Sequence, residues 1–154
     1  MSQYGAEVVW ERGGQDFAGG HYSRAHRWRF DGGVEVPASA SPLHVPPPGS
    51  DPSAVDPEEA FVAALSSCHM LYFLYFAAKR GVVVERYEDD AVGEMGPNAQ
   101  GRQAIVRVVL RPRVTYGAGA MDGAAAEAAL HHEAHEHCYL ANSVRTEVLV
   151  EPHH

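Results

Sequence analysis

The sequence predicts an α+β fold, in which short strands form hairpins and two separate helices pack against them. Three observations predict it. Residues 61–78 contain no Asp, Glu, Lys or Arg, and a helix-start signal at Asp56 precedes them. A second, alanine-rich helical stretch follows Asp122 and ends near His137. Short stretches of alternating apolar and polar residues lie before, between and after these helices, as is typical of strands.

Length and composition narrow the classes of protein. A chain of 154 residues is expected to form one domain, residues 1–154. The formal net charge of −8 argues against a nucleic-acid partner, because phosphate binding needs clustered Lys and Arg. Two cysteines are too few for a disulfide-stapled scaffold or for a zinc site of four cysteines. The N-terminus lacks a basic start followed by an apolar core, so we expect a cytoplasmic protein.

The N-terminal region predicts a hairpin followed by a long loop. Residues 7–11 form a short apolar stretch, and residues 21–30 are typical of a strand. Asp31-Gly32-Gly33 predicts a turn, after which residues 34–36 resume the alternation. Residues 42–57 are rich in proline and predict a loop that is long enough to have a function.

The first helix has clear start and stop signals. Asp56 suits the N-cap, Pro57 suits the first helical position, and Glu59 stands where a capping box needs an acid. Gly81 is a natural stop. The uncharged stretch approaches the length of a membrane span, but its centre is Ser-Ser-Cys-His. We therefore expect a helix buried on all sides by a sheet or by a second subunit, and no membrane partner.

The rest of the chain predicts strands around the second helix. Residues 82–88, 104–116 and 144–150 are typical of strands, and residues 93–101 predict the turn between the first two. Pro112 suggests a break or an edge position in the second of these. Its face carrying Arg107 is expected to be solvated, opposite an apolar face. Asp122 is expected to cap the second helix. The predicted order is β-β-β-α-β-β-α-β.

The two cysteines leave two interpretations open. Cys68 lies in the middle of the first helix, and Cys138 follows the second helix, 70 positions later. Both can be buried small hydrophobic residues, which is common for free cysteine. A reactive cysteine needs a nearby cation or a helix N-terminus, and Cys68 is too deep in its helix for the latter. Its candidate cations are His69 and the early arginines: Arg24, Arg27 and Arg29.

Two stretches resemble the OsmC/Ohr family of osmotically inducible and organic-hydroperoxide-resistance proteins. Residues 56–68 resemble that family's Asn/Asp-Pro-Glu helix start, in which the reactive cysteine follows the Glu by ten residues, as Cys68 follows Glu58. Residues 135–142, leading into 144–148, resemble its second cysteine near the end of the second long helix. The order of elements also agrees. The resemblance implies an OsmC-like fold over 1–154, with antiparallel sheets around two long helices, in an intertwined homodimer.

The same resemblance implies a cysteine-based, thiol-dependent peroxidase that needs no cofactor or metal. Cys68 would attack an organic hydroperoxide and become a sulfenic acid, and Cys138 would resolve it to a disulfide. An external dithiol would then reduce the disulfide. The family also holds its thiolate with the helix-start Glu, here Glu58, and an early arginine. Arg24 is the best match for this arginine, and Arg27 is the alternative.

Helix geometry indicates a dimer with shared active sites. Ten residues of helix span about 15 Å, and ten steps of about 100° turn the two side chains to different faces. Glu58 therefore cannot reach Cys68 of its own straight helix. Either the helix breaks or Glu58 comes from a second subunit. A dimer would also cover the apolar stretch at residues 71–76.

Two features depart from the peroxidase interpretation. His69 stands where the family has an aromatic or aliphatic residue, and Tyr139 stands where it often has Pro. A separate cluster also needs explanation, because residues 131–137 carry four histidines and two glutamates. His131 and His135 have the i,i+4 spacing of two ligands on one metal, yet a solvated helix face has the same pattern. A metal-binding His-rich module and a structural dimer with inert thiols are the alternative functions.

Overall fold

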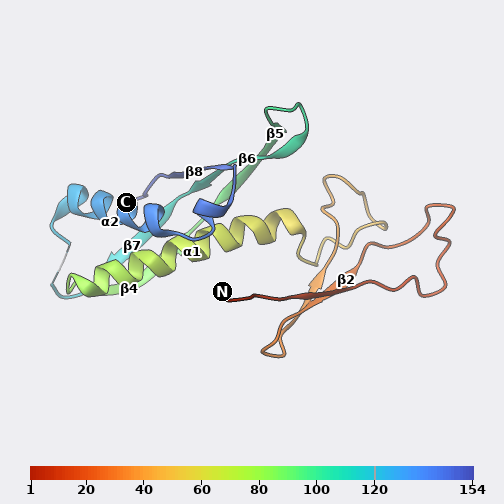
Figure 1. Cartoon of the computed structure of the whole chain (residues 1–154), viewed down its shortest axis with the longest axis horizontal. Helices are drawn as coiled ribbons and strands as arrows, with labels where there is room; N and C mark the ends of the chain where they lie inside the picture. The colour runs from red at the N-terminus through yellow and green to blue at the C-terminus, as the bar shows by residue number, and fades with distance from the viewer. Residues whose placement is uncertain (120) are drawn as a thin grey trace. The chain divides into compact units, whose positions relative to one another are not determined.

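The chain folds into two compact units, Met1–Ala60 and Phe61–His154, in a computed structural model that describes residues 1–119 and 121–154. Whether 1–154 is a single domain stays a prediction. The elements in chain order are β1 (Glu7–Val9), β2 (His26–Arg29), β3 (Glu35–Ala38), α1 (Pro57–Lys79), β4 (Val84–Asp89), β5 (Val92–Pro97), β6 (Gln103–Leu110), β7 (Pro112–Tyr116), α2 (Gly123–His137), a 3-10 turn (Ala141–Ser143) and β8 (Glu147–Val150) (Figure 1).

The first unit contains one antiparallel sheet in the order β1-β2-β3. The predicted hairpin is confirmed, and its turn uses Gly33 at a φ of 91°, which favours glycine. The predicted strand at 21–30 is shorter in the structure. The backbone before β2 makes other hydrogen bonds: the Arg24 N–H donates to the Gly49 carbonyl at 2.8 Å, and the Trp10 indole donates to the Ser23 carbonyl at 2.9 Å.

The predicted ends of α1 are confirmed. The Glu59 N–H donates to Asp56 Oδ1 at 2.8 Å, and the Asp56 N–H donates back to Glu59 Oε2 at 3.2 Å, which is a capping box. At the other end Gly81 has a φ of 70° and the Val82 N–H donates to the Ala77 carbonyl at 3.0 Å. This is the bond of a Schellman C-cap. The predicted cap at Asp122 is only partly right, because its side chain occupies the N-cap of α2 without a capping hydrogen bond among the described residues.

The second unit contains two sheets. β4 pairs with β7 antiparallel, while β6 pairs with β5 antiparallel and with β8 parallel. The predicted turn at 93–101 is right only in its second half, because β5 covers residues 93–97 and the turn begins at Asn98. Gly93 allows a close approach of two segments rather than a turn, since a Cβ at this position would lie 2.7 Å from a methyl group of Val62. The predicted strand at 104–116 is two strands, separated at Arg111, whose N–H donates to Asp89 Oδ1 at 2.6 Å.

The core of the second unit forms where α1 meets α2 and the sheets. In one cluster Phe73, Phe76 and Ala77 of α1 pack against Leu130 and Ala134 of α2, with side chains of β4 and β7 around them. In the other, Leu65 of α1 packs against Val108 and Leu110. Arg107 is exposed on the opposite face of β6, as predicted. These clusters bury one face of α1.

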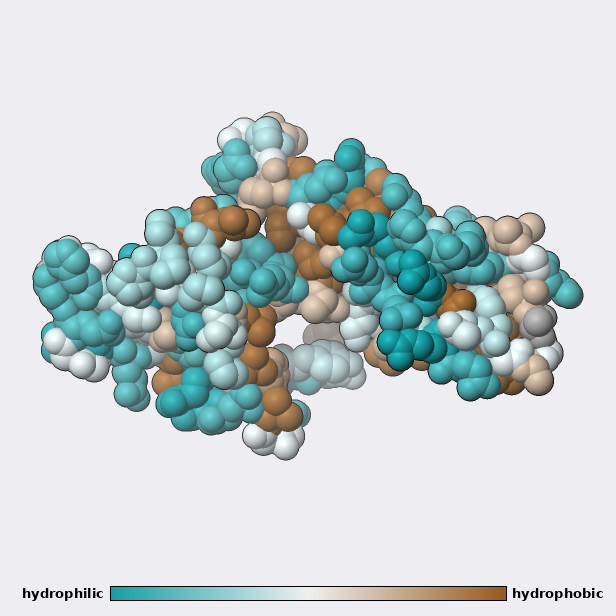
Figure 2. Space-filling view, turned by 180° about the vertical axis from the view of Figure 1, so that it is seen from behind, coloured by the Kyte–Doolittle hydropathy of each residue, from teal (hydrophilic) through white to brown (hydrophobic). Residues whose placement is uncertain are grey.

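The other face of α1 is uncovered in the single chain, so the sheets alone do not bury this helix on all sides; burial by a second subunit stays a prediction. Leu71 is 59% exposed and Tyr75 is 54% exposed. In the described part of the chain, α1 is the one helix long and apolar enough to cross a membrane, and 28% of its most apolar stretch is buried. Hydrophobic residues also reach the surface among hydrophilic ones in the space-filling view (Figure 2). The single chain therefore leaves a large apolar helix face without cover.

A buried histidine pair joins the two helices. His69 of α1 and His131 of α2 are 1% and 3% exposed, their rings stack at 5.3 Å, and His69 Nε2 lies 3.0 Å from His131 Nδ1. Burial lowers the pKa of His69 to about 3 and that of His131 to about 4. The interpretation of the histidine cluster as a solvated face is therefore wrong for His131, although His132 and His137 are exposed.

We expect the capping box to stabilise the protein measurably. Asp56→Ala should lower the free energy of unfolding by about 1 kcal/mol, because the Glu59 N–H at the start of the helix loses its side-chain acceptor. Asp122→Ala is the matched control, and it should change the free energy by less than about 0.5 kcal/mol because Asp122 makes no capping bond. Urea unfolding followed by circular dichroism measures both. Equal losses would contradict the assignment.

We also expect the histidine pair to make stability depend on pH. The ordinary histidine pKa of 6.5 applies to the unfolded chain, while the folded values are lower, so the unfolded chain binds more protons below that pH. The stability contribution is complete above pH 6.5 and falls as the pH drops toward 4. Imidazole NMR signals of His69 and His131 should stay in the neutral form at pH 5. Protonation of either ring in the folded protein above pH 6 would contradict this.

Candidate thiol site

The packing of α1 against α2 brings the two cysteines into contact. Cys68 is half-buried in α1, and Cys138 is 1% exposed at the C-cap of α2. Both are free thiols, and they share a hydrogen bond. Residues 70 positions apart in the sequence thus form one dithiol. No sequence signal placed them together, apart from the family resemblance.

The two thiols have different surroundings. Burial first, and the hydrogen bond with Cys68 second, raise the pKa of Cys138 to about 11. The Ala141 N–H donates to the Cys138 sulfur at 3.4 Å and acts in the opposite direction. Cys138 therefore keeps its proton at neutral pH.

Two tyrosines stand beside the dithiol, and the sequence interpretation missed their pairing. Tyr72 lies one helical turn after Cys68, and Tyr139 follows Cys138 directly. Their rings meet edge to face at 5.4 Å. The Tyr72 hydroxyl donates to that of Tyr139, and this bond is the main reason why the pKa of Tyr72 rises to about 12. The i,i+4 spacing to Cys68 was the available signal.

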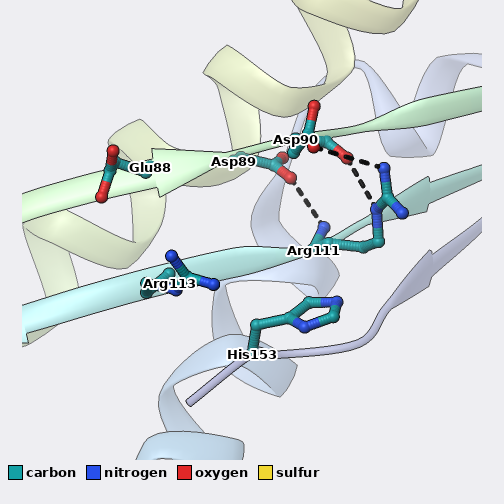
Figure 3. A pocket seen from close by; sticks show the side chains of 6 residues that line it. All are labelled: Glu88, Asp89, Asp90, Arg111, Arg113 and His153. Carbon is teal, nitrogen blue, oxygen red and sulfur yellow. Dashed lines mark hydrogen bonds and ion pairs between the residues drawn. The ribbon is translucent and has the colours of Figure 1, made fainter.

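The second unit has a polar pocket beside β4, β7 and the C-terminal segment (Figure 3). It has a volume of about 380 Å³ and is lined by Glu88, Asp89, Asp90, Arg111, Arg113 and His153. Arg111 Nε donates to the Asp90 carbonyl at 2.7 Å, and Ser66 of α1 donates to Asp89. The lining acids and bases largely neutralise one another. The hydrogen bond from Ser66 to Asp89 joins α1 to β4 two residues before Cys68.

The first unit holds both candidate arginines. The Arg24 guanidinium lies 4.0 Å from the centre of the Tyr22 ring and donates to the Tyr22 carbonyl at 2.8 Å. A Cβ at Gly49 would lie 3.0 Å from Arg24 Nη1, so a glycine there gives the guanidinium room. Arg27 is exposed on β2, and Arg29 pairs with Glu35 at 2.7 Å. Arg24 is thus held in place within its unit, while Arg29 is occupied.

Glu58 lies in the first turn of α1, and its Oε2 atom is buried without a hydrogen-bond partner among the described residues. α1 runs without a break from Pro57 to Lys79. The expected separation along the helix between Glu58 and Cys68 therefore stands.

The described histidines, cysteines and acids do not gather into a group of three able to hold a metal ion. In the histidine cluster, His131 faces inward to His69, while His132 faces outward and pairs with Glu136 at 3.3 Å. The side chains of these neighbouring histidines therefore point to opposite sides of α2 and not toward a common site.

Comparison with known proteins identifies relatives. Residues 49–153 match the family model of the OsmC-like proteins. An OsmC-like protein of unknown function from Vibrio cholerae has a structure with 51% identity and a TM-score of 0.97, over 99% of this chain and 100% of that chain. A comparison with curated proteins found no significant match.

More distant structures share the fold. The organic hydroperoxide resistance protein from Elizabethkingia anophelis is 18% identical with a TM-score of 0.68, over 99% of this chain and 94% of that chain. The corresponding protein OhrB from Bacillus subtilis is 19% identical with a TM-score of 0.64, over 97% and 98%. The expected α+β fold is confirmed, and the chain belongs to the OsmC-like protein family.

Proposed function

We propose that this protein is a thiol-dependent peroxidase that reduces organic hydroperoxides, with Cys68 as the reacting thiol and Cys138 as the resolving thiol. The observation that carries the proposal is the contact between a half-buried and a fully buried thiol. Structural relatives named organic hydroperoxide resistance proteins support it. An inert pair of core cysteines would not require one thiol to be within reach of solvent.

The first step is the attack of the Cys68 thiolate on the outer oxygen of the hydroperoxide. The S–O bond forms, the O–O bond breaks, and the alkoxide leaves with the electron pair and takes up a proton to become an alcohol. Cys68 is oxidised to a sulfenic acid. The buried Cys138 keeps its proton during this step, because burial raises its pKa to about 11.

The second step joins the two sulfurs. The Cys138 sulfur attacks the Cys68 sulfur, the S–S bond forms, and the S–O bond breaks. The proton of Cys138 leaves with the hydroxyl group as water. Because the thiols already touch, this step needs no large movement of either helix. An external dithiol then reduces the disulfide by exchange, which suits a reducing compartment such as the cytoplasm, and no cofactor takes part.

Arg24 and Glu58 complete the proposed site. A guanidinium beside the sulfur favours the thiolate and orients the peroxide, and a carboxylate bonded to it fixes its direction. Arg24 is the better candidate than Arg27 because Tyr22 already holds its guanidinium. Glu58 is a suitable partner because its buried Oε2 lacks one among the described residues.

We infer that the working unit is a homodimer with shared sites. α1 is unbroken, so helix geometry keeps Glu58 and Cys68 of one chain apart. The uncovered face of α1, with Leu71 and Tyr75, provides an apolar surface that a second copy would bury. Glu58 would then serve the thiol of the partner subunit.

Removing the reacting sulfur should abolish activity. We expect Cys68→Ser to reduce turnover of cumene hydroperoxide and tert-butyl hydroperoxide with a dithiol reductant to the uncatalysed background. Cys138→Ser should consume peroxide once per chain and stop at a sulfenic acid, which dimedone traps and mass spectrometry detects. Unchanged turnover in folded Cys68→Ser would rule the peroxidase out.

Mixing two inactive variants tests the shared site. We expect Cys68→Ser and Glu58→Gln to be inactive or strongly impaired as separate homodimers, with sizes measured by light scattering. After co-refolding in equal amounts, half of the dimers are mixed, and each mixed dimer has one intact site, so about a quarter of wild-type activity should return. If each site lies within one chain, no mixed dimer has an intact site. No recovery, or monomers in solution, would therefore contradict the shared site.

A further inference from the structure

The tyrosine pair beside the dithiol has no role in the steps above. Tyr72 lies on the same face of α1 as Cys68, one turn away, and close enough to both sulfurs for their charge to disfavour its ionisation. Its ring is half-buried between Phe76 of its own helix, at 6.1 Å, and Tyr139. Tyr139 is 71% exposed. One hydroxyl therefore stands by the sulfurs, and its hydrogen-bond partner belongs to a solvent-exposed residue.

We propose that Tyr72 is the proton donor to the alkoxide that leaves when Cys68 cleaves the hydroperoxide, and that Tyr139 returns a proton to it from solvent. The inference rests on the proposed peroxidase. It extends that proposal because cleavage of the O–O bond releases a strongly basic alkoxide, for which the thiolate itself has no proton.

The transfer balances in protons and electrons. The Cys68 sulfur donates an electron pair to the outer oxygen, and the O–O bonding pair stays with the alkoxide. The Tyr72 hydroxyl gives its proton to that oxygen, and the alcohol leaves. The resulting phenolate takes a proton from the Tyr139 hydroxyl through the existing hydrogen bond, reversed in direction, and Tyr139 takes one from water. No further oxidant or reductant takes part.

Other groups near the sulfurs suit this role less well. The proton of Cys138 is needed in the following step, where it leaves with the hydroxyl group. His69 is buried in its neutral form, and its Nε2 is bonded to His131. Tyr72 keeps its proton at neutral pH and is therefore always ready to donate it. The phenol differs from these in having a path to solvent through Tyr139.

The test removes one oxygen atom and varies the leaving group. Tyr72→Phe keeps the ring, and the second-order rate of Cys68 oxidation is measured by stopped flow with tert-butyl hydroperoxide and with peracetic acid. The alkoxide of the first needs a proton, so its rate should fall about 100-fold. The leaving group of peracetic acid is acetate, which needs no proton. The rate with peracetic acid should therefore change less than about 3-fold, since no proton-transfer catalysis is lost.

The controls separate this role from packing. Tyr87→Phe removes another half-buried phenol from the same unit, one with no hydrogen-bond partner among the described residues, and should leave both rates unchanged. Tyr139→Phe should lower the rate of Cys68 oxidation by tert-butyl hydroperoxide by a smaller factor than Tyr72→Phe does, because water can partly replace the Tyr139 hydroxyl. The inference fails if Tyr72→Phe slows both substrates equally or neither. An active Cys68→Ser enzyme would instead reject the peroxidase itself.

Discussion

The contact between α1 and α2 is the constraint on which the rest of the second unit depends. Burying a side chain such as Phe73 contributes about 1.5–3 kcal/mol, whereas a hydrogen bond contributes about 0.5–1.5 kcal/mol net. Apolar packing of Phe73, Leu130 and Ala134 therefore supplies the attraction between the helices. The bond between His69 and His131 adds direction, because it forms at one relative position of the two helices. That position also brings Cys68 to Cys138.

Burial is the main difference between the two thiols in this arrangement. Cys138 lies at the end of α2, where the turn that follows it closes over the sulfur. Cys68 lies on the part of α1 that remains within reach of solvent. A large reagent meets Cys68 first, and Cys138 can react only with what Cys68 becomes. The order of the proposed steps thus follows from which sulfur is covered.

Local signals in the sequence predicted the parts of the fold that depend on neighbouring residues. The capping box at Asp56 and the stop at Gly81 are of this kind, since each needs only a few residues of backbone. Gly93 was misread because its local pattern is that of a turn, while its reason is the nearby methyl group of Val62. His131 was misread for the same reason, since only the partner helix decides which histidines face inward. The meeting of the sulfurs likewise required the tertiary structure.

The uncovered face of α1 connects assembly with chemistry. Leu71 and Tyr75 follow Cys68 by three and seven residues, so the apolar surface that α1 exposes to water lies on the same side of the helix as this thiol. If a second copy covers this surface, its own α1 approaches, and the start of that helix carries Glu58 with a buried oxygen that lacks a partner among the described residues. The same burial of apolar surface that would stabilise the dimer would then deliver the carboxylate to the thiol. A chain separated from its partner would then keep both thiols but lack the Glu58 carboxylate that is proposed to orient Arg24.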